Sequence, residues 1–520
     1  MLFSMMILAG APAAVACGGM FCDAVAPVDQ AAERIFFFVH EGRVTTEVQI
    51  TYEGESDEFA WVVPVPGEPT VTLSNDAMFT LVANQTTPTL QLTVDRGASG
   101  GCLFAAPADF SKDTASANSY DDGGAISVVS REAVGPYDMV VLLATDAQVL
   151  VGWLQDNGYD LPDGLDATLE PYVASQQYFV ALKLQSDKDA GDIAPIAMTY
   201  AASAASIPIQ LTAVAAVDDM PIEVFVFGEA RAVPDNYLSV ELNEAAFNWY
   251  EGADNYREVV SAAVDEAGGL AFVTDWAAPS SDFTFVVYDE GWVDEDHLAT
   301  LDPVAFLEAV LYGGLPRSTQ GDALLVELVP PPEGVGTAEF LSCPSCYTVE
   351  VEGWDPAAAA ARVDEELLAV HRAQQERINR SDYATRLFTT MDPGEMTADP
   401  VFVLNGDVPA DVSAVHAATS TERENLFASQ NTRRTLSLAD GRQIVLDGLD
   451  DSAAARERLG TPAAIRIVDM GANGLGEVVF DHRDAAAAEV TAFNNGCDES
   501  AGLVAPWVVL GAGLLRRRRR

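Results

Sequence analysis

Apolar and polar residues alternate near the start of the chain in a pattern that predicts a hairpin. After Glu41 and Gly42, apolar or β-branched residues occupy every second position over residues 44–52, and a second apolar run, residues 34–40, precedes the turn. Because successive side chains of a strand point to opposite faces, this period indicates two paired strands. Further runs of strand type cover residues 59–66, 89–94, 139–143, 178–184, 207–217, 222–227 and 283–288. Pro64 and Pro66 favour an edge or an exit from the sheet for the first of these.

Helical spacing is interleaved with the strand runs. It predicts helices over residues 76–83, 147–157, 256–266 and 303–311. The strongest helical pattern covers residues 355–380, where Asp355 and Pro356 supply a cap and a first position. We interpret this helix as a core-packing element rather than a partner-binding one. The mixture predicts an α+β fold with a β-rich N-terminal domain.

The length of 520 residues exceeds the usual size of one core, so more than one unit is expected. Residues 328–336 combine prolines and glycines without periodicity, and we place a seam there. The expected units are a signal peptide (1–16), an extracytoplasmic α+β domain (17–335), a smaller α+β unit (336–495) and a C-terminal membrane or sorting segment (496–520). The smaller unit includes a predicted hairpin that turns at Asp440 and Gly441.

Both ends of the chain carry features of an exported protein. Residues 2–10 are apolar, and the small residues Ala14 and Ala16 fit a signal-peptidase site, so we expect cleavage after Ala16. No Lys or Arg precedes the apolar run, which departs from the usual pattern. Cys17 leaves lipoprotein acylation as an alternative, but Ala14 stands where such sites usually have Leu. Ordinary cleavage is therefore favoured.

The C-terminal segment is apolar over residues 501–515 and ends in five arginines, residues 516–520. Fifteen helical residues rise only about 22 Å, whereas a hydrocarbon core is ~30 Å thick. The arginines would remain cytoplasmic and leave the body outside, in agreement with a signal peptide. The order of Cys497, apolar segment and arginines resembles the bacterial sorting signals of the myxobacterial type, whose tail a membrane protease removes. We favour sorting over plain membrane anchoring.

Charge limits the partners of the chain. Its 79 acidic and 28 basic residues give a net charge of -51, which repels phosphate backbones, so we expect no nucleic-acid partner. High-salt solvation, cation binding and solubility would each explain the acid excess, and solubility is favoured. The expected partners are the membrane, through the C-terminal segment, and a sorting protease; the sequence indicates no other protein.

Six cysteines make disulfides the favoured interpretation in an exported chain. The candidates are Cys17, Cys22, Cys102, Cys343 and Cys346, while Cys497 is assigned, with Ala16, to sorting and processing. Cys17 with Cys22, and Cys343 with Cys346, could close short loops, which leaves Cys102 single unless it takes a partner from one of these pairs. A redox role for Cys343 and Cys346 is less favoured, because the residues that follow look extended rather than helical. Zinc is less favoured still, since no His lies near.

No pattern identifies catalytic, cofactor-binding or metal-binding residues. Gly97-Ala-Ser-Gly-Gly101 matches the letters of a nucleophile elbow, but a glycine-rich surface loop explains it better. None of the five histidines has a metal-ligand spacing. Acidic clusters at residues 187–192 and 294–296 could bind calcium weakly, but neither completes a twelve-residue loop, and solvated turns are favoured. We therefore expect no cofactor beyond such weak calcium binding.

Two motifs carry a resemblance to a known family. They are Ala16-Cys-Gly-Gly-Met-Phe-Cys22, followed by residues 27–30, and Phe59-Ala-Trp-Val-Val-Pro-Val-Pro66. With a looser block, Thr385-Arg-Leu-Phe-Thr-Thr-Met391 and Met396-Thr-Ala-Asp-Pro400, they resemble the bacterial family called domain of unknown function 2330 (DUF2330). The resemblance implies secreted or surface-exposed bacterial proteins, often with a C-terminal anchor. It implies no assigned activity and transfers no catalytic residues.

The sequence thus predicts an exported, cell-envelope-associated protein that is membrane-anchored or sorted to the cell surface. We favour a non-catalytic structural or adhesive role over an enzyme. One alternative is an extracytoplasmic hydrolase with dispersed site residues, which a pocket with convergent His, Asp and Ser side chains would support. The other is a calcium- or ligand-binding surface module.

Overall fold

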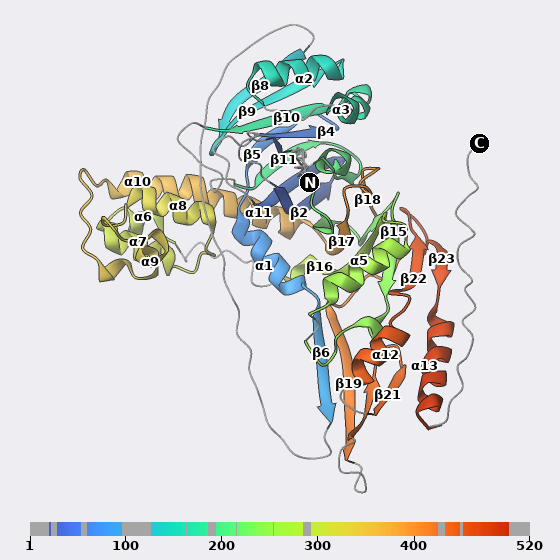
Figure 1. Ribbon diagram of the computed structural model, residues 1–520. Coiled ribbons are helices and arrows are strands. Elements are labelled where there is room, and N and C mark those ends of the chain that lie inside the picture. The colour runs from blue at the N-terminus through green and yellow to red at the C-terminus, as the bar shows by residue number, and fades with distance from the viewer. Residues whose placement is uncertain are drawn as a thin grey trace, which may run out of the picture.

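The computed structural model describes most of the chain between residues 20 and 498. The described ranges are 20–21, 29–53, 60–95, 126–159, 161, 165–185, 194–214, 216–252, 254–283, 293–424, 432–447 and 451–498. Within them the fold is α+β, with β-rich sheets and interleaved helices (Figure 1), as the sequence predicts.

A ten-stranded sheet is the centre of the fold, with the strand order β23-β22-β15-β16-β17-β13-β2-β3-β11-β5. Its strands are β2 (Asp29–His40), β3 (Arg43–Glu53), β5 (Thr70–Leu73), β11 (Ile196–Ala201), β13 (Met220–Gly228), β15 (Leu238–Leu242), β16 (Ala271–Pro279), β17 (Tyr383–Met391), β22 (Ala464–Asp469) and β23 (Glu477–Asp481). The β2/β3 hairpin turns at Glu41 and Gly42, which both have positive φ. The predicted first hairpin is therefore confirmed.

A five-stranded sheet packs on one face of the ten-stranded sheet (Figure 1). Its order is β1-β4-β10-β9-β8, with β1 (Met20–Phe21), β4 (Ala60–Val65), β8 (Ile126–Val134), β9 (Tyr137–Ala144) and β10 (Tyr178–Leu184). In β4, Val63 faces the core between the two sheets and Val62 faces the opposite side. β1 pairs with β4 only as far as Trp61, so the proline-containing end of β4 pairs with β10 alone among the described strands.

Helices cover the outer faces of both sheets. α2 (Ala147–Asp156) and α3 (Leu165–Ala174) pack on the five-stranded sheet, and α1 (Asp76–Thr86) packs on the far face of the ten-stranded sheet. Phe36 of β2 stacks on Phe79 of α1 with ring centroids 4.0 Å apart, whereas Phe37 faces the core between the sheets. β2 is thus buried on both faces, which explains its uninterrupted apolar run.

A group of helices lies between β16 and β17 in the chain and forms a core of its own. It contains α6 (Glu295–Leu298), α7 (Pro303–Leu311), α8 (Thr319–Leu328), α9 (Thr337–Ser342) and α10 (Pro356–Val363). A π-turn over Asp364–Leu368 joins α10 to α11 (Ala369–Arg380), and together they form the long helix that the sequence predicts. Asp302 and Asp355 cap α7 and α10 through their side chains.

The long helix is joined to the ten-stranded sheet by a buried polar cluster. The Glu47 side chain is fully buried and accepts hydrogen bonds from Ser74 Oγ (2.5 Å) and Gln374 Nε2 (2.7 Å). Arg377 of α11 donates to the other oxygen of the same carboxylate. These charge-assisted bonds satisfy a carboxylate that would be costly to bury alone.

The remaining described elements form two smaller sheets and the helices beside them. One sheet has the order β21-β20-β19-β6, with β6 (Thr89–Asp95), β19 (Val415–Glu424), β20 (Thr432–Ser437) and β21 (Gln443–Asp447), and it packs with α5 (Tyr256–Glu266), α12 (Asp451–Leu459) and α13 (Arg483–Asp498). The other contains β12 (Ala205–Ser206), β18 (Val401–Leu404) and β14 (Ala232–Pro234). The predicted hairpin at Asp440 and Gly441 is the β20/β21 connection.

One predicted strand is wrong. Residues 207–217 include a short helix, α4 (Ile209–Thr212), whose Ile209 faces the core between the sheets and whose Leu211 faces the outer core. A short apolar run that is buried on two sides has no period that separates a helix from a strand. Of the predicted strand 283–288, only Phe283 lies within the described residues. The predicted glycine-rich loop at residues 97–101 lies outside them.

The strand order shows how the segments on either side of the proposed seam are combined. The proposed seam, residues 328–336, lies within the helical group, and β17, which comes after it, is a central strand of the ten-stranded sheet. Among the described residues no helix has both the length and the apolar character that a membrane crossing requires. The predicted terminal segment, residues 501–520, lies outside them, so the structure gives it no support.

Candidate functional site

The structure describes only part of the residues that the sequence singles out. Cys343 and Cys346 form a disulfide across the turn that follows α9. Cys497 lies in α13. Ala16, Cys17, Cys22 and Cys102 lie outside the described residues, as does the acidic cluster at residues 187–192.

The position of the disulfide argues against a redox role. Cys343 ends α9 and is followed only by a single 3-10 turn, Pro344–Cys346, whereas a reactive dithiol has its first cysteine at the beginning of a longer helix. The partial negative charge at a helix C-terminus disfavours a thiolate. A structural bridge remains the better interpretation of this pair.

Replacing both Cys343 and Cys346 with serine is expected to lower the free energy of unfolding by about 2 kcal/mol, because the bridge closes a very short loop. Urea unfolding of the oxidised protein and the double variant measures this difference. The reduced wild type is the matched control and should unfold like the variant. Equal stability of all three would show that the bridge does not constrain the unfolded chain.

The acidic cluster at residues 294–296 has a structural explanation. Asp294 Oδ1 accepts hydrogen bonds from the backbone N–H groups of Asp296 (3.0 Å) and His297 (3.3 Å), so it caps α6. In the described part of the chain, no three or more His, Cys, Asp or Glu side chains are grouped closely enough to hold a metal ion.

A serine and a histidine meet where β2 and α11 end. His40 Nε2 lies 2.8 Å from Ser381 Oγ, while Ser381 Oγ donates its proton to the carbonyl oxygen of Arg377 at 3.0 Å. With its one proton directed to this carbonyl, the Ser381 hydroxyl is left to accept from His40, in the tautomer that carries the proton on Nε2. A nucleophilic serine needs the opposite direction, with the histidine accepting. This pair therefore ends a helix rather than forming a catalytic dyad.

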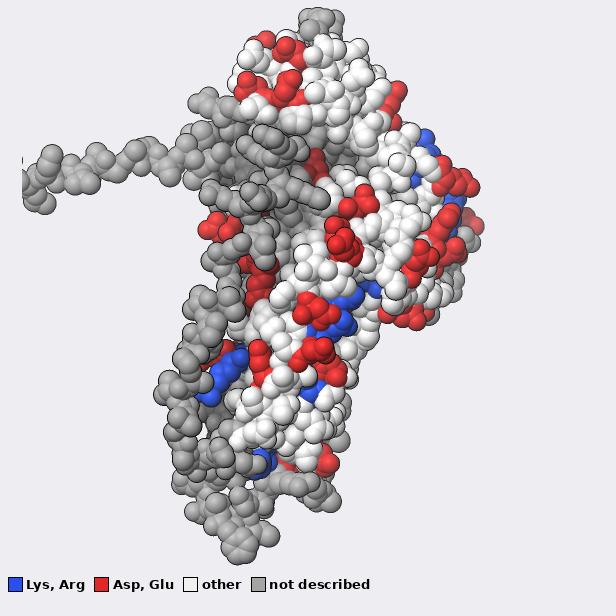
Figure 2. All heavy atoms as spheres, turned by 90° about the vertical axis from the view of Figure 1, so that its right-hand side faces the viewer, with Lys and Arg blue, Asp and Glu red and all other residues white. Residues whose placement is uncertain are grey.

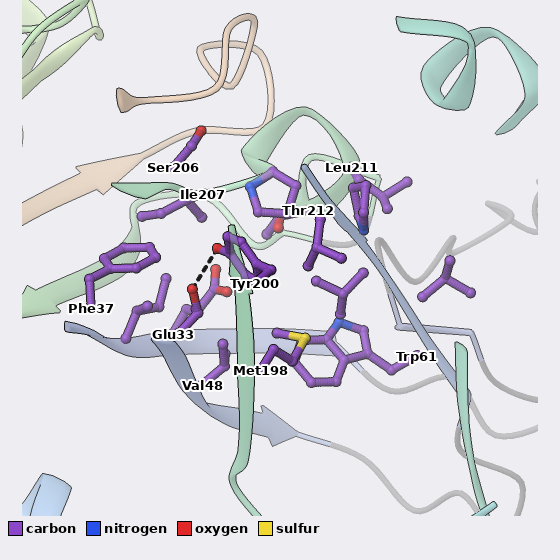
Figure 3. A pocket seen from close by; sticks show the side chains of 17 residues that line it. Glu33, Phe37, Val48, Trp61, Met198, Tyr200, Ser206, Ile207, Leu211 and Thr212 are labelled. Carbon is purple, nitrogen blue, oxygen red and sulfur yellow. Dashed lines mark hydrogen bonds between the residues drawn. The ribbon is translucent and has the colours of Figure 1, made fainter. Parts of the chain in front are cut away.

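A cavity lies between the two large sheets (Figure 3). Its volume is about 30 Å³, enough for roughly two water molecules. β2, β3, β4 and β11 form its walls, together with the segment that contains β12 and α4. Its lining residues are Glu33, Ile35, Phe37, Thr46, Val48, Trp61, Val62, Val63, Pro64, Val65, Met198, Tyr200, Ser206, Ile207, Pro208, Leu211 and Thr212.

Glu33 is the one charged residue among these lining residues. It is 5% exposed, and its Oε2 atom has no hydrogen-bond partner among the described residues. Burial raises the pKa of the Glu33 carboxyl from 4.5 to about 7, because the apolar surroundings disfavour the charged form. Native proteins rarely leave such a group unsatisfied, so Glu33 marks this cavity as the candidate site.

Two of the hydroxyls that line the cavity are hydrogen-bonded to one another. Thr46 Oγ1 and Tyr200 Oη are hydrogen-bonded at 2.7 Å, as the dashed line in Figure 3 marks. Burial raises the pKa of Tyr200 to about 12, so its hydroxyl stays protonated at neutral pH. The site thus offers one unpartnered carboxyl oxygen, Glu33 Oε2, in a wall that is mostly apolar and also carries the hydroxyls of Ser206 and Thr212.

Sequence reasoning missed Glu33, although a signal was present. Glu33 lies two and four residues before Ile35 and Phe37, so the strand period places all three on the same buried face. A charged residue on the apolar face of a strand is unusual, and the alternation of side chains along the strand was enough to identify it.

A second buried charged cluster lies on the far face of the ten-stranded sheet. Arg386 donates to Glu223 at 3.3 Å, and its Nε lies 3.2 Å from Asp275 Oδ2, an ion-pair distance without the alignment of a hydrogen bond. Tyr256 donates to the other oxygen of Asp275, and Arg34 donates to Glu223 at 3.0 Å. Every charge here has an opposite partner, which indicates a structural role.

The fold and the cavity together define an α+β protein whose two-sheet core encloses a small apolar site with one buried carboxyl group. The chain belongs to the family described as an uncharacterized protein conserved in bacteria, DUF2330, whose model matches residues 11–301, more than half of the chain. The two specific motifs lie within this match, and the looser block after residue 385 lies beyond it. No curated protein and no solved structure matches the chain.

Proposed function

We propose that this protein is exported from the cytoplasm and remains attached to the cell envelope as a non-catalytic structural or adhesive surface protein. The disulfide between Cys343 and Cys346 carries the proposal, because disulfides persist in oxidising compartments and are rare in the cytosol. Residues 1–16, which have the pattern of a signal peptide, also indicate export.

The C-terminal segment is proposed to hold the protein at the membrane until a sorting protease removes it after Cys497. Its fifteen apolar residues are short for a permanent span, and the five arginines that follow would stop transfer at the cytoplasmic side. Retention of the whole segment as a plain anchor is the alternative.

The surface charge supports an exposed, solvated body. Figure 2 shows Asp and Glu side chains spread over the visible face, with Lys and Arg in fewer places. With a net charge of -51, this surface would repel nucleic acids and anionic lipids at long range. The body is thus proposed to extend away from the membrane into solvent.

The alternatives differ in their support. The hydrolase alternative is weakened by the His40–Ser381 pair, whose hydrogen bond runs in the wrong direction for catalysis. The calcium alternative is weakened at Asp294, which caps a helix instead. The ligand-binding alternative gains support from the cavity around Glu33.

The location is tested by trapping the thiols of native cells with acid, alkylating them, and mapping the peptide that contains Cys343 and Cys346. An exported protein yields this peptide oxidised and unlabelled, and its body is digested when protease is added to intact cells. A cytosolic protein is the matched control for both steps. A labelled peptide in protease-resistant material would contradict export.

A further inference from the structure

The cavity between the sheets contains a buried carboxyl oxygen that has no hydrogen-bond partner among the described residues. Glu33 Oε2 is buried and unpartnered within the described structure, while the neighbouring hydroxyls of Thr46 and Tyr200 are already paired with one another. A buried carboxylate without a donor is costly, so Glu33 either holds a proton or takes a donor from a group bound in the cavity.

The described part of the chain does not supply the missing positive charge. Arg34, the adjacent residue, points to the other face of β2, where its Nε donates to Glu223 at 3.0 Å. The shift in the Glu33 pKa has burial as its cause, with no cation acting on it. Among the described residues nothing offsets a charge on Glu33, so a bound cation would supply that charge.

The walls restrict what such a ligand can be. Phe37, Trp61 and Met198 face the cavity in Figure 3; aromatic rings attract small cations, and the thioether packs against an apolar part of a ligand. A volume of about 30 Å³ admits only a few heavy atoms. A calcium ion would need six or more oxygen ligands, which one carboxylate cannot supply.

We propose that this cavity binds a small primary ammonium compound, whose –NH₃⁺ group donates to Glu33 Oε2 while its short alkyl part lies against the apolar wall. Two of the lining residues, Trp61 and Ser206, are partly exposed, so the cavity borders the surface. The inference goes beyond the proposed export and does not depend on it.

Methylammonium chloride is the probe, titrated into the full-length protein and followed by saturation-transfer NMR, with potassium chloride holding the ionic strength constant. A ligand of this size is expected to bind with a dissociation constant on the order of millimolar. The Glu33→Gln variant keeps the shape of the site and loses its charge. Its affinity should fall about tenfold or more, the usual loss for a hydrogen bond to a charged group.

The Glu68→Gln variant is the matched control, because Glu68 is exposed in the turn between β4 and β5. It should bind methylammonium like the wild type. Circular dichroism of both variants establishes that they are folded. Equal binding by the wild type and Glu33→Gln, no saturable binding by the wild type, or a crystal structure with only water beside Glu33 after soaking would each overturn the proposal.

Discussion

Replacing Arg386 with methionine is expected to lower the free energy of unfolding by about 3–5 kcal/mol, the largest effect of any single substitution considered for this protein. The guanidinium is 4% exposed and lies between Glu223 and Asp275, whose side chain is fully buried. Methionine fills a similar volume but leaves the Asp275 carboxylate without a cation. Urea unfolding followed by circular dichroism measures the loss.

The matched control is Arg380→Met. Arg380 also pairs with a glutamate, Glu376, but both side chains are largely exposed, at 73% and 69%. Solvent screens such a pair, so this variant should lose at most about 0.5 kcal/mol. If the two variants were equally stable, the cluster around Arg386 would not be the buried structural element described above.

Replacing Glu33 with glutamine is expected to remove a pH dependence of stability. The pKa of Glu33 is raised from 4.5 to about 7 in the folded state. The folded protein therefore binds this proton more tightly than the unfolded chain does, and the wild type loses stability as the pH rises through this interval. Between about pH 4 and about pH 9, the unfolding free energy of the wild type should fall by about 3 kcal/mol relative to that of the Glu33→Gln variant.

Unfolding curves for the wild type and the variant across this range measure the effect. The difference between the two proteins isolates Glu33 from the other titrating groups, and Glu68→Gln serves as the exposed control, which should follow the wild type. A constant difference across the range would mean that Glu33 is solvated or paired in solution. Such a result would remove the main reason for treating the cavity as a site.

Local signals were sufficient to predict many individual elements. The helices over Tyr256–Glu266 and Pro303–Leu311 have the predicted bounds. The second begins where its sequence predicts, because Asp302 caps the helix and Pro303 suits its first position. The hairpin at Glu41 and Gly42 likewise needed only a turn and a period of two.

The arrangement of these elements could not be predicted in the same way. β17 lies between β16 and β13, although the whole helical group separates it from β16 in the chain. Strand partners over such separations depend on which faces pack together, and one sequence does not record this. Prolines and glycines, as at residues 328–336, mark a turn whether or not a domain ends there.

The candidate site could likewise be predicted only in part, because its residues are local and its cavity is not. The strand period places Glu33 on a buried face, but the cavity exists only because the segment with α4 closes over β2 and β4. Sequence reasoning assigned that segment to a strand and so could not have placed it there. The partners of Arg386 likewise come from strands distant in the chain.

The central claim is that this chain is exported and processed at both ends, and the intact mass of the protein from envelope and medium fractions of native cells tests it most directly. The account predicts a chain that begins at Cys17 and ends near Cys497. A mass that retains residues 516–520 would replace sorting with a plain membrane anchor. A mass that also retains residues 1–16, found in the cytosolic fraction, would contradict the account.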